Sequence, residues 1–194
     1  MFFGRKKELA NLEKMYQSNK FECAIVYGRR RIGKTTLINE FIKDKKTIYF
    51  QAQQTNEKMN LQLFSQSVYH TFQDSRYLPP FENFVSALHY IRELAEQEKL
   101  VLFIDEYPYL AESVPGISSI LQEFIDRYFS NQPNLMIILC GSSMSFMENQ
   151  VLGYQSPLYG RRTGQFKIDP LSIWETKEML PGFSNQIGRA SCRE

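Results

Sequence analysis

The residues with the clearest chemical potential lie in one short segment, Gly28-Arg29-Arg30-Arg31-Ile32-Gly33-Lys34-Thr35. This segment matches the pattern G-x-x-x-x-G-K-[ST]. In that pattern the backbone N–H groups turn around phosphate oxygens, the lysine reaches the terminal phosphates and the hydroxyl ligates Mg²⁺. An apolar run, Cys23 to Tyr27, precedes it, and a helical pattern, Thr36 to Ile42, follows. The context predicts a strand, a loop that binds nucleotide phosphates through residues from Gly28 to Thr36, and a helix.

The three consecutive arginines occupy the variable positions of this loop. Arg29, Arg30 and Arg31 could contact phosphate, a lid or a nucleic-acid backbone, although exposed, solubilising charges are the default. The sequence places them in the binding segment and assigns none of them a specific role.

A second pair of reactive groups follows the apolar run Leu100 to Ile104, where Asp105 is succeeded by Glu106. This is the Walker B arrangement, in which the aspartate holds Mg²⁺, so Thr35 and Asp105 are the expected metal ligands. Glu106 is placed to accept a proton from the water that attacks a γ-phosphate, and with Lys34 it is an expected catalytic residue. The alternative is a solvated acid at a strand end; the accompanying phosphate loop favours hydrolysis.

Two further candidates follow later strands. Ser142, in Gly141-Ser142-Ser143, places a hydroxyl where it can hold the attacking water or sense the γ-phosphate; the alternative is turn chemistry that caps the next helix. Arg161, with Arg162 beside it, can neutralise charge on the transferred phosphoryl group, either in cis or from a neighbouring subunit, or it is part of a solvated basic turn.

Strand and helix patterns alternate along the chain. Strands are expected at 23–27, 47–52, 100–104, 136–140 and 165–168, and helices at 9–16, 36–42, 61–72, 84–94, 120–128 and 144–151. Three of the strands are continuous apolar runs, which favours an α/β fold with a three-layer, doubly wound parallel sheet. Ligands of such sheets lie beyond the carboxyl ends of the strands, where Gly28, Asp105 and Gly141 are all expected.

The composition is that of an ordinary soluble domain, with 194 residues, 43% hydrophobic residues and a formal charge of +2. The charge is too mild to indicate nucleic acid, and without a signal-peptide core or membrane-length apolar run we expect a cytoplasmic protein. Cys23 and Cys140 lie in apolar runs and are expected to be buried and unpaired. Residues 187–194 resemble a translated sequencing adapter, so we expect them to be a non-native tail. Before it we expect an ATPase domain at 1–171 and the start of a truncated helical lid at 172–186.

Several blocks together resemble the archaeal-type ATPase family, a branch of the AAA+ and STAND ATPases. They are Phe3-Gly4-Arg5-x-x-Glu8-Leu9, the Tyr27–Thr35 loop, Asp105-Glu106-Tyr107-Pro108-Tyr109-Leu110, Leu139-Cys140-Gly141-Ser142-Ser143 and Ser156-Pro157-Leu158-Tyr159-Gly160-Arg161-Arg162. The resemblance implies a P-loop NTPase fold of the AAA+/ASCE type that binds ATP with Mg²⁺. It also implies that Gly4 and Arg5 lie near the adenine, that Ser142 or Ser143 is the sensor residue, and that Arg161 is an arginine finger.

These observations favour an ATPase module whose nucleotide state switches a C-terminal effector domain. Protein or DNA partners would act through C-terminal domains. The sequence leaves open whether the protein forms a homo-oligomer. One alternative is a DNA-engaging ATPase similar to origin-recognition proteins. A small-molecule kinase is a weaker alternative because no acceptor-binding lid is evident, and a GTPase is disfavoured because the N-K-x-D guanine motif is missing.

Overall fold

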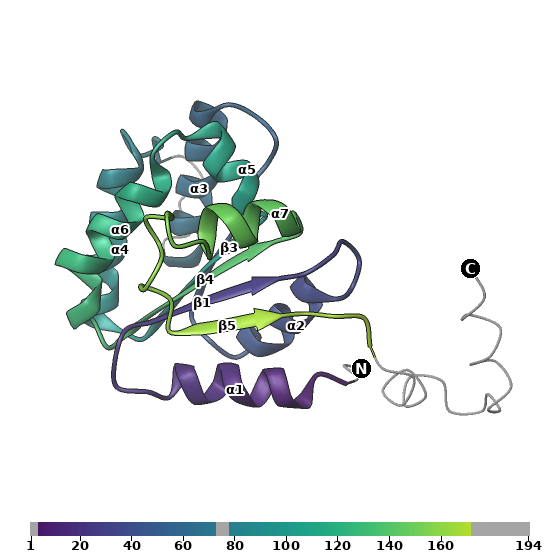
Figure 1. Ribbon diagram of the computed structural model, residues 1–194. Helices are drawn as coiled ribbons and strands as arrows, with labels where there is room; N and C mark the ends of the chain where they lie inside the picture. Colours follow the sequence, from purple (N-terminus) through teal and green to yellow (C-terminus); the bar gives the residue numbers. More distant parts are fainter. Residues whose placement is uncertain (1–3, 73–77, 172–194) are drawn as a thin grey trace, which may run out of the picture.

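The computed structural model describes residues 4–72 and 78–171. A five-stranded sheet of order β2-β3-β4-β1-β5 runs through the centre of this part of the chain (Figure 1). The strands are β1 (Glu22–Tyr27), β2 (Thr47–Gln51), β3 (Leu100–Asp105), β4 (Leu135–Gly141) and β5 (Gly164–Lys167). Every pairing between them is parallel, which confirms the expected doubly wound sheet.

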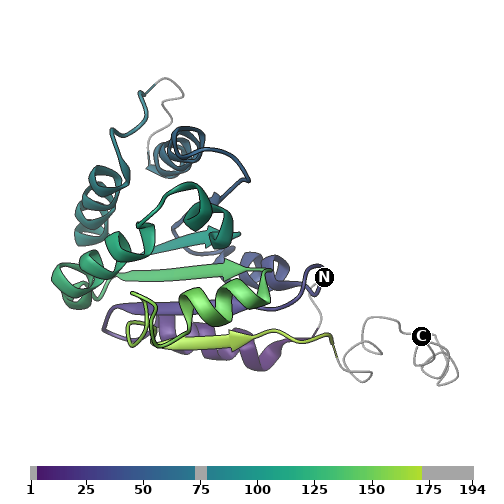
Figure 2. The same cartoon turned by 45° about the horizontal axis from the view of Figure 1, so that its top comes forward.

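Helices cover both faces of the sheet, giving three layers (Figures 1 and 2). One face carries α1 (Lys6–Tyr16) and α2 (Lys34–Ile42). The other carries α3 (Glu57–Phe72), α4 (Phe84–Gln97), α5 (Tyr107–Ser113) and α6 (Ile117–Arg127). Short segments complete the chain, namely η1 (Phe129–Asn131), α7 (Met144–Phe146) and the π-helical η2 (Met147–Val151).

The three central strands, β1, β3 and β4, are buried along their whole length because alternate side chains enter two separate cores. In β1, Cys23 and Ile25 pack in the core beneath α3 to α6, whereas Ala24 and Val26 pack in the core beneath α1 and α2. This period of two is the geometry of an extended strand, and burial on both faces removes the need for polar alternation. Cys23 and Cys140 are buried free thiols, as expected.

The structure differs from the sequence expectations in a helix after β3 and in the ends of three strands. The helix α5 was not expected, although Pro108 lies in its first turn, where proline is well tolerated. Strands β1, β3 and β4 each extend one residue or more beyond the expected apolar run, so that Asp105 and Gly141 close their strands. The expected lid at 172–186 and tail at 187–194 lie outside the described residues.

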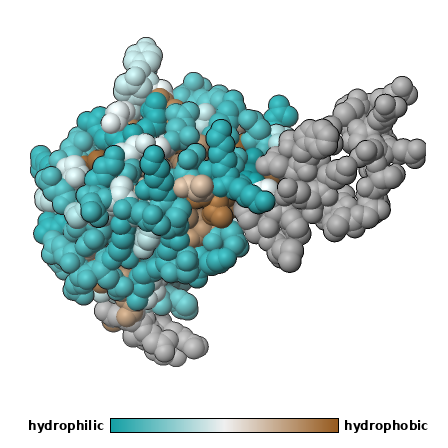
Figure 3. Space-filling view, turned by 90° about the horizontal axis from the view of Figure 1, so that it is seen from below, coloured by the Kyte–Doolittle hydropathy of each residue, from teal (hydrophilic) through white to brown (hydrophobic). Residues whose placement is uncertain are grey.

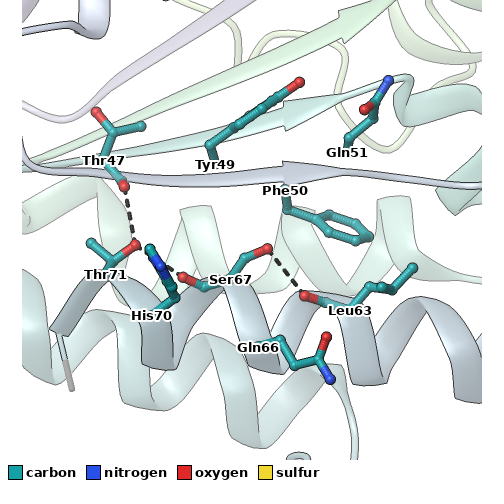
Figure 4. A pocket seen from close by; sticks show the side chains of 9 residues that line it. All are labelled: Thr47, Tyr49, Phe50, Gln51, Leu63, Gln66, Ser67, His70 and Thr71. Carbon is teal, nitrogen blue, oxygen red and sulfur yellow. Dashed lines mark hydrogen bonds between the residues drawn. The ribbon is translucent and has the colours of Figure 1, made fainter. Parts of the chain in front are cut away.

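Helix α3 packs against the edge strand β2 (Figure 4). Thr71 Oγ1 donates a 3.1 Å hydrogen bond to the carbonyl of Thr47, which satisfies part of the strand's open edge. An open cavity of about 540 Å³ lies between the two elements, lined mainly by polar side chains.

The face on the α1 side is mostly hydrophilic where described residues form it, with one apolar patch near its centre (Figure 3). No helix among residues 4–72 and 78–171 is long and apolar enough to cross a membrane.

Candidate nucleotide-binding site

The loop between β1 and α2 depends on its two glycines for different reasons. A Cβ atom at Gly28 would lie 2.2 Å from the backbone oxygen of Ile168, a clash with main chain that no side chain can relieve. Gly33 has φ of 88°, in the left-handed region that glycine enters without strain, and α2 begins at the next residue. These positions let the backbone wrap tightly ahead of a helix N-terminus, the usual site for a phosphate group.

Lys34 places its charge inside the curve of this loop. Its Nζ atom donates hydrogen bonds to the carbonyl of Gly28 at 2.9 Å and to that of Arg29 at 2.8 Å. The residue is only 7% exposed, so these carbonyls satisfy an ammonium group that would otherwise be buried without partners. A cation is therefore held where the motif places the terminal phosphates.

Thr35 and Asp105 meet across the carboxyl ends of the strands. Thr35 Oγ1 donates a 2.9 Å hydrogen bond to Asp105 Oδ2, and Asp105 is only 2% exposed. The hydroxyl and the carboxylate are hard oxygen ligands of the kind that Mg²⁺ takes, usually one or two from the protein with substrate phosphates and water completing the shell. Among the described residues no group of three or more His, Cys, Asp or Glu side chains gathers to form an all-protein metal cage.

The surroundings of Asp105 include two residues whose sequence positions gave no warning. Burial, followed by the adjacent Asp105 carboxylate, raises the pKa of Tyr49 to about 12. The same two causes raise the pKa of the Cys140 thiol well above its usual value. Both groups therefore remain protonated at neutral pH.

Glu106 turns the chain sharply at the end of β3. Its φ of 52° and ψ of 44° are left-handed values, uncommon for a residue with a side chain, and α5 starts at the next residue. Its backbone N–H donates a 2.9 Å hydrogen bond to Asp105 Oδ1. The turn thus aims the two neighbouring carboxylates at different targets.

The target of Glu106 is Ser142, the residue after β4. Ser142 Oγ lies 3.0 Å from Oε1 and 2.9 Å from Oε2 of Glu106, so its hydroxyl donates to this carboxylate. Ser143 is exposed and stands at the N-cap of α7 without a side-chain capping bond. The structure therefore joins Ser142, and not Ser143, to the acid pair.

Gly141 allows this approach. A Cβ atom there would lie 2.6 Å from Met147 Sδ and 2.9 Å from Pro108 Cδ. Only glycine lets η2 and α5 close on the end of β4 in this way.

Arg30 reaches from the loop to the same group. Its NH2 atom donates a 2.6 Å hydrogen bond to the hydroxyl of Tyr109, and its Nε lies 3.4 Å from Ser142 Oγ. A chain of donors thus runs from Arg30 through Ser142 to Glu106. Arg29 and Arg31 are exposed.

Arg5 ties the start of the chain to the loop. Although charged, it is only 7% exposed, and its guanidinium donates to the carbonyls of Ile32 and Asp169 and pairs with Glu8. Gly4 and Arg5 therefore lie beside the loop and the segment that follows β5, although no contact in the structure tests their expected role near adenine.

Arg161 is not brought to this group of residues. Its guanidinium forms a bidentate pair with Asp126, with Nε to Oδ1 at 3.1 Å and NH2 to Oδ2 at 2.8 Å. Arg161 precedes β5, and Thr163 bonds to Cys23 at the start of β1, whereas the loop follows the end of β1. Five residues of strand separate Cys23 from Gly28 by roughly 16 Å. Arg161 therefore lies toward the amino end of the parallel strands, away from the phosphate loop at their carboxyl ends.

The sequence-based site is thus assembled in large part. Lys34, Thr35, Asp105, Glu106 and Ser142 converge, together with the loop that runs from Gly28 to Thr36. The sequence missed Tyr109 and Tyr49. Tyr109 stands one helical turn after Glu106, a spacing that could have drawn attention to it.

Comparison with known proteins identifies the family of this chain. Residues 2–193 match the family described as an ATPase domain predominantly from Archaea. The chain is 34% identical over 181 residues to the uncharacterized protein MJECL04 of Methanocaldococcus jannaschii, covering 93% of this chain and 38% of that protein. It is also 52% identical over 46 residues to an uncharacterized ATP-binding protein of the same organism, MJ0423, covering 24% of this chain and 78% of the relative.

Solved structures share the fold. The Walker-type ATPase PABY2304 of Pyrococcus abyssi superposes with a TM-score of 0.67 at 23% identity, over 91% of this chain and 56% of that one. The Aeropyrum pernix ORC1 protein, solved in complex with DNA, gives 0.64 at 17% identity, over 98% of this chain and 50% of that one. The chain spans about half the length of these structures. The family match over nearly its whole length shows that the chain belongs to the ATPase domains found predominantly in Archaea.

Proposed function

We propose that this domain binds ATP with Mg²⁺ and hydrolyses its γ-phosphate bond. The observation that carries the proposal is the convergence of two hydrogen-bonded pairs at the ends of β3 and β4, Thr35 with Asp105 and Ser142 with Glu106. One pair suits a metal ion and the other suits an attacking water. Both lie beside a loop whose backbone and buried lysine suit phosphate.

In the proposed site the loop amides and Lys34 hold the phosphate chain, and Thr35 with Asp105 would hold Mg²⁺. The bound ion would neutralise charge on the β- and γ-phosphates. Charged and dipolar groups that are already fixed in place stabilise such charge without having to reorganise during the reaction.

Glu106 is the proposed base. Its carboxylate would orient a water, accept a proton from it, and so promote attack on the γ-phosphorus. Ser142 would position that carboxylate through the hydrogen bond that its hydroxyl donates. Alternatively, its hydroxyl would donate to the γ-phosphate when ATP is bound. A kinase would need an alcohol of an acceptor molecule at this position in place of the water.

The nucleotide state would act as a switch on other parts of the protein. The DNA-bound ORC1 structure shares the fold, which motivates the DNA-engaging alternative without deciding it. Arg161 is half-buried, pairs with Asp126 and lies far along the sheet from the loop of its own chain, so a phosphate-contacting role for it requires a neighbouring subunit in a homo-oligomer.

The test is phosphate release by the purified full-length protein with ATP, with and without added DNA. We expect Mg²⁺-dependent release of phosphate without any acceptor molecule. Formation of ADP that requires an added alcohol, with the phosphoryl group recovered on that alcohol and no free phosphate, would support the kinase reading. Salt-dependent DNA binding that changes between ATP and ADP would support the DNA-engaging reading.

A further inference from the structure

We propose that Arg30 is a catalytic residue supplied in cis, whose guanidinium contacts the γ-phosphoryl group as it is transferred. The inference rests on the proposed ATPase function and adds to it the cation that Arg161 does not supply in its own chain. It comes from the position of Arg30, which the sequence left without a role.

The first argument is location. Of the three loop arginines, Arg30 is the one whose guanidinium reaches Ser142 and Tyr109. Ser142 in turn bonds to Glu106, the proposed base. The guanidinium therefore borders the place where the attacking water and the γ-phosphate would meet.

The second argument is charge. Arg30 bonds to two neutral hydroxyls, and among the described residues no carboxylate forms a salt bridge with it. Arg161, by contrast, is already engaged by Asp126 with two hydrogen bonds. A phosphate offers the guanidinium two charged acceptor oxygens that match its fork, whereas the hydroxyls are neutral, so a phosphate would compete well for Arg30.

The third argument is chemistry. During hydrolysis a bond forms between the water oxygen and the γ-phosphorus, the bond from that phosphorus to the β–γ bridging oxygen breaks, and the water proton passes to Glu106, giving ADP and phosphate. Charge spreads over the equatorial oxygens of the transferred group, and a forked guanidinium matches two of them. Lys34 faces the loop carbonyls of Gly28 and Arg29, so Arg30 adds a second cation from the side of Ser142.

The test compares the affinities of ADP and of ADP with aluminium fluoride, a mimic of the transferred phosphoryl group, in the full-length protein with Mg²⁺. We expect Arg30→Ala to bind ADP within about threefold of the wild type but to bind the mimic at least ~100-fold more weakly, and to lower kcat about 10³-fold. Arg30→Lys should recover part of both losses, since it keeps the charge and loses the fork.

Arg127→Ala is the matched control, because Arg127 is an exposed arginine on α6 that pairs with Glu123 at 2.9 Å. It should leave both affinities and kcat unchanged. Arg30 is exposed, so its removal should leave the fold intact, as a thermal unfolding curve will verify.

The proposal is overturned if Arg30→Ala keeps the wild-type ratio of the two affinities within about threefold. If the ratio is kept while the wild-type protein turns over ATP and Glu106→Gln abolishes that turnover, only the proposed role of Arg30 is refuted. The proposed ATPase function would then stand. A wild-type protein that binds both nucleotides without turnover would overturn the proposed function, while the affinity ratio would still decide the role of Arg30. A protein that binds neither would overturn both.

Discussion

The hydroxyl of Thr35 and the carboxylate of Asp105 stand 2.9 Å apart although 70 positions separate them in the chain. Thr35 is the second residue of α2, and Asp105 is the last residue of β3. The loop, the start of the helix and the end of the strand must therefore all be correctly placed for the contact to form. This contact is the firmest structural link between the two sequence motifs.

Asp105→Asn tests this pair as a metal site. The amide oxygen can still accept from Thr35, but it lacks the charge that attracts a divalent cation. A lost interaction with a charged group is worth about 1.5–3 kcal/mol, so Mg²⁺-dependent ATP affinity should fall about ten- to a hundredfold. Calorimetric titration with and without Mg²⁺ measures this, with the exposed Asp44→Asn as control. Unchanged Mg²⁺ dependence in Asp105→Asn would remove Asp105 from the metal site.

Ser142→Ala and Ser143→Ala distinguish two adjacent hydroxyls. Only Ser142 contacts Glu106, so Ser142→Ala should lower kcat about 10²-fold with little change in ATP affinity, whereas Ser143→Ala should leave kcat nearly unchanged. Steady-state kinetics on both variants gives the comparison. The opposite order of effects would show that the side chains rearrange when ATP binds.

Gly141→Ala tests the tight contact behind the site. The new methyl group would enter space held by Met147 and Pro108, and such overpacking destabilises by about 1–3 kcal/mol. Urea unfolding should show this loss. Combining it with Met147→Ala should cost less than the sum of the single changes, because the second change removes the nearest obstacle. Strict additivity would mean that the clash is relieved elsewhere.

Arg161→Ala tests the ion pair with Asp126. The pair is largely exposed, so its removal should lower the free energy of unfolding by about 0–1 kcal/mol at neutral pH. The hydrogen bond from Arg161, its largest cause, lowers the pKa of Asp126 in the folded protein. A carboxyl group whose pKa is lower in the folded protein stabilises the fold at pH values above its unfolded pKa of about 3.9. This stabilisation is lost as the pH falls through the folded pKa. The difference between wild type and variant should therefore vanish in acid. A difference that persists in acid would point to packing by the arginine stem.

The sequence predicted the sheet, its parallel direction and the proximity of most candidate site residues, because each depends on local patterns. Apolar runs such as Leu100 to Ile104 mark buried strands, and the motif spacing fixes where Lys34, Thr35 and Asp105 stand relative to them. Parallel strands then bring their carboxyl ends to one edge without further information.

The remaining contacts depend on tertiary structure that no local pattern encodes. Helix α5 has seven residues, too few to show a clear helical period. The direction of Arg30 depends on how the loop turns, including the left-handed φ of 63° at Arg31. The pairing of Arg161 with Asp126 joins residues 35 positions apart on different elements, so an arginine expected near phosphate is found engaged elsewhere.

The measurement that tests the central claim most directly is ATP turnover by the full-length protein and its Glu106→Gln variant. Glutamine keeps the size of the side chain and an oxygen that can accept from Ser142, but it cannot take the proton from water. We predict that the variant binds ATP as tightly as the wild type and hydrolyses it about 10²- to 10⁴-fold more slowly. Equal hydrolysis by the two proteins, or a wild type that binds ATP and does not hydrolyse it, would contradict the account.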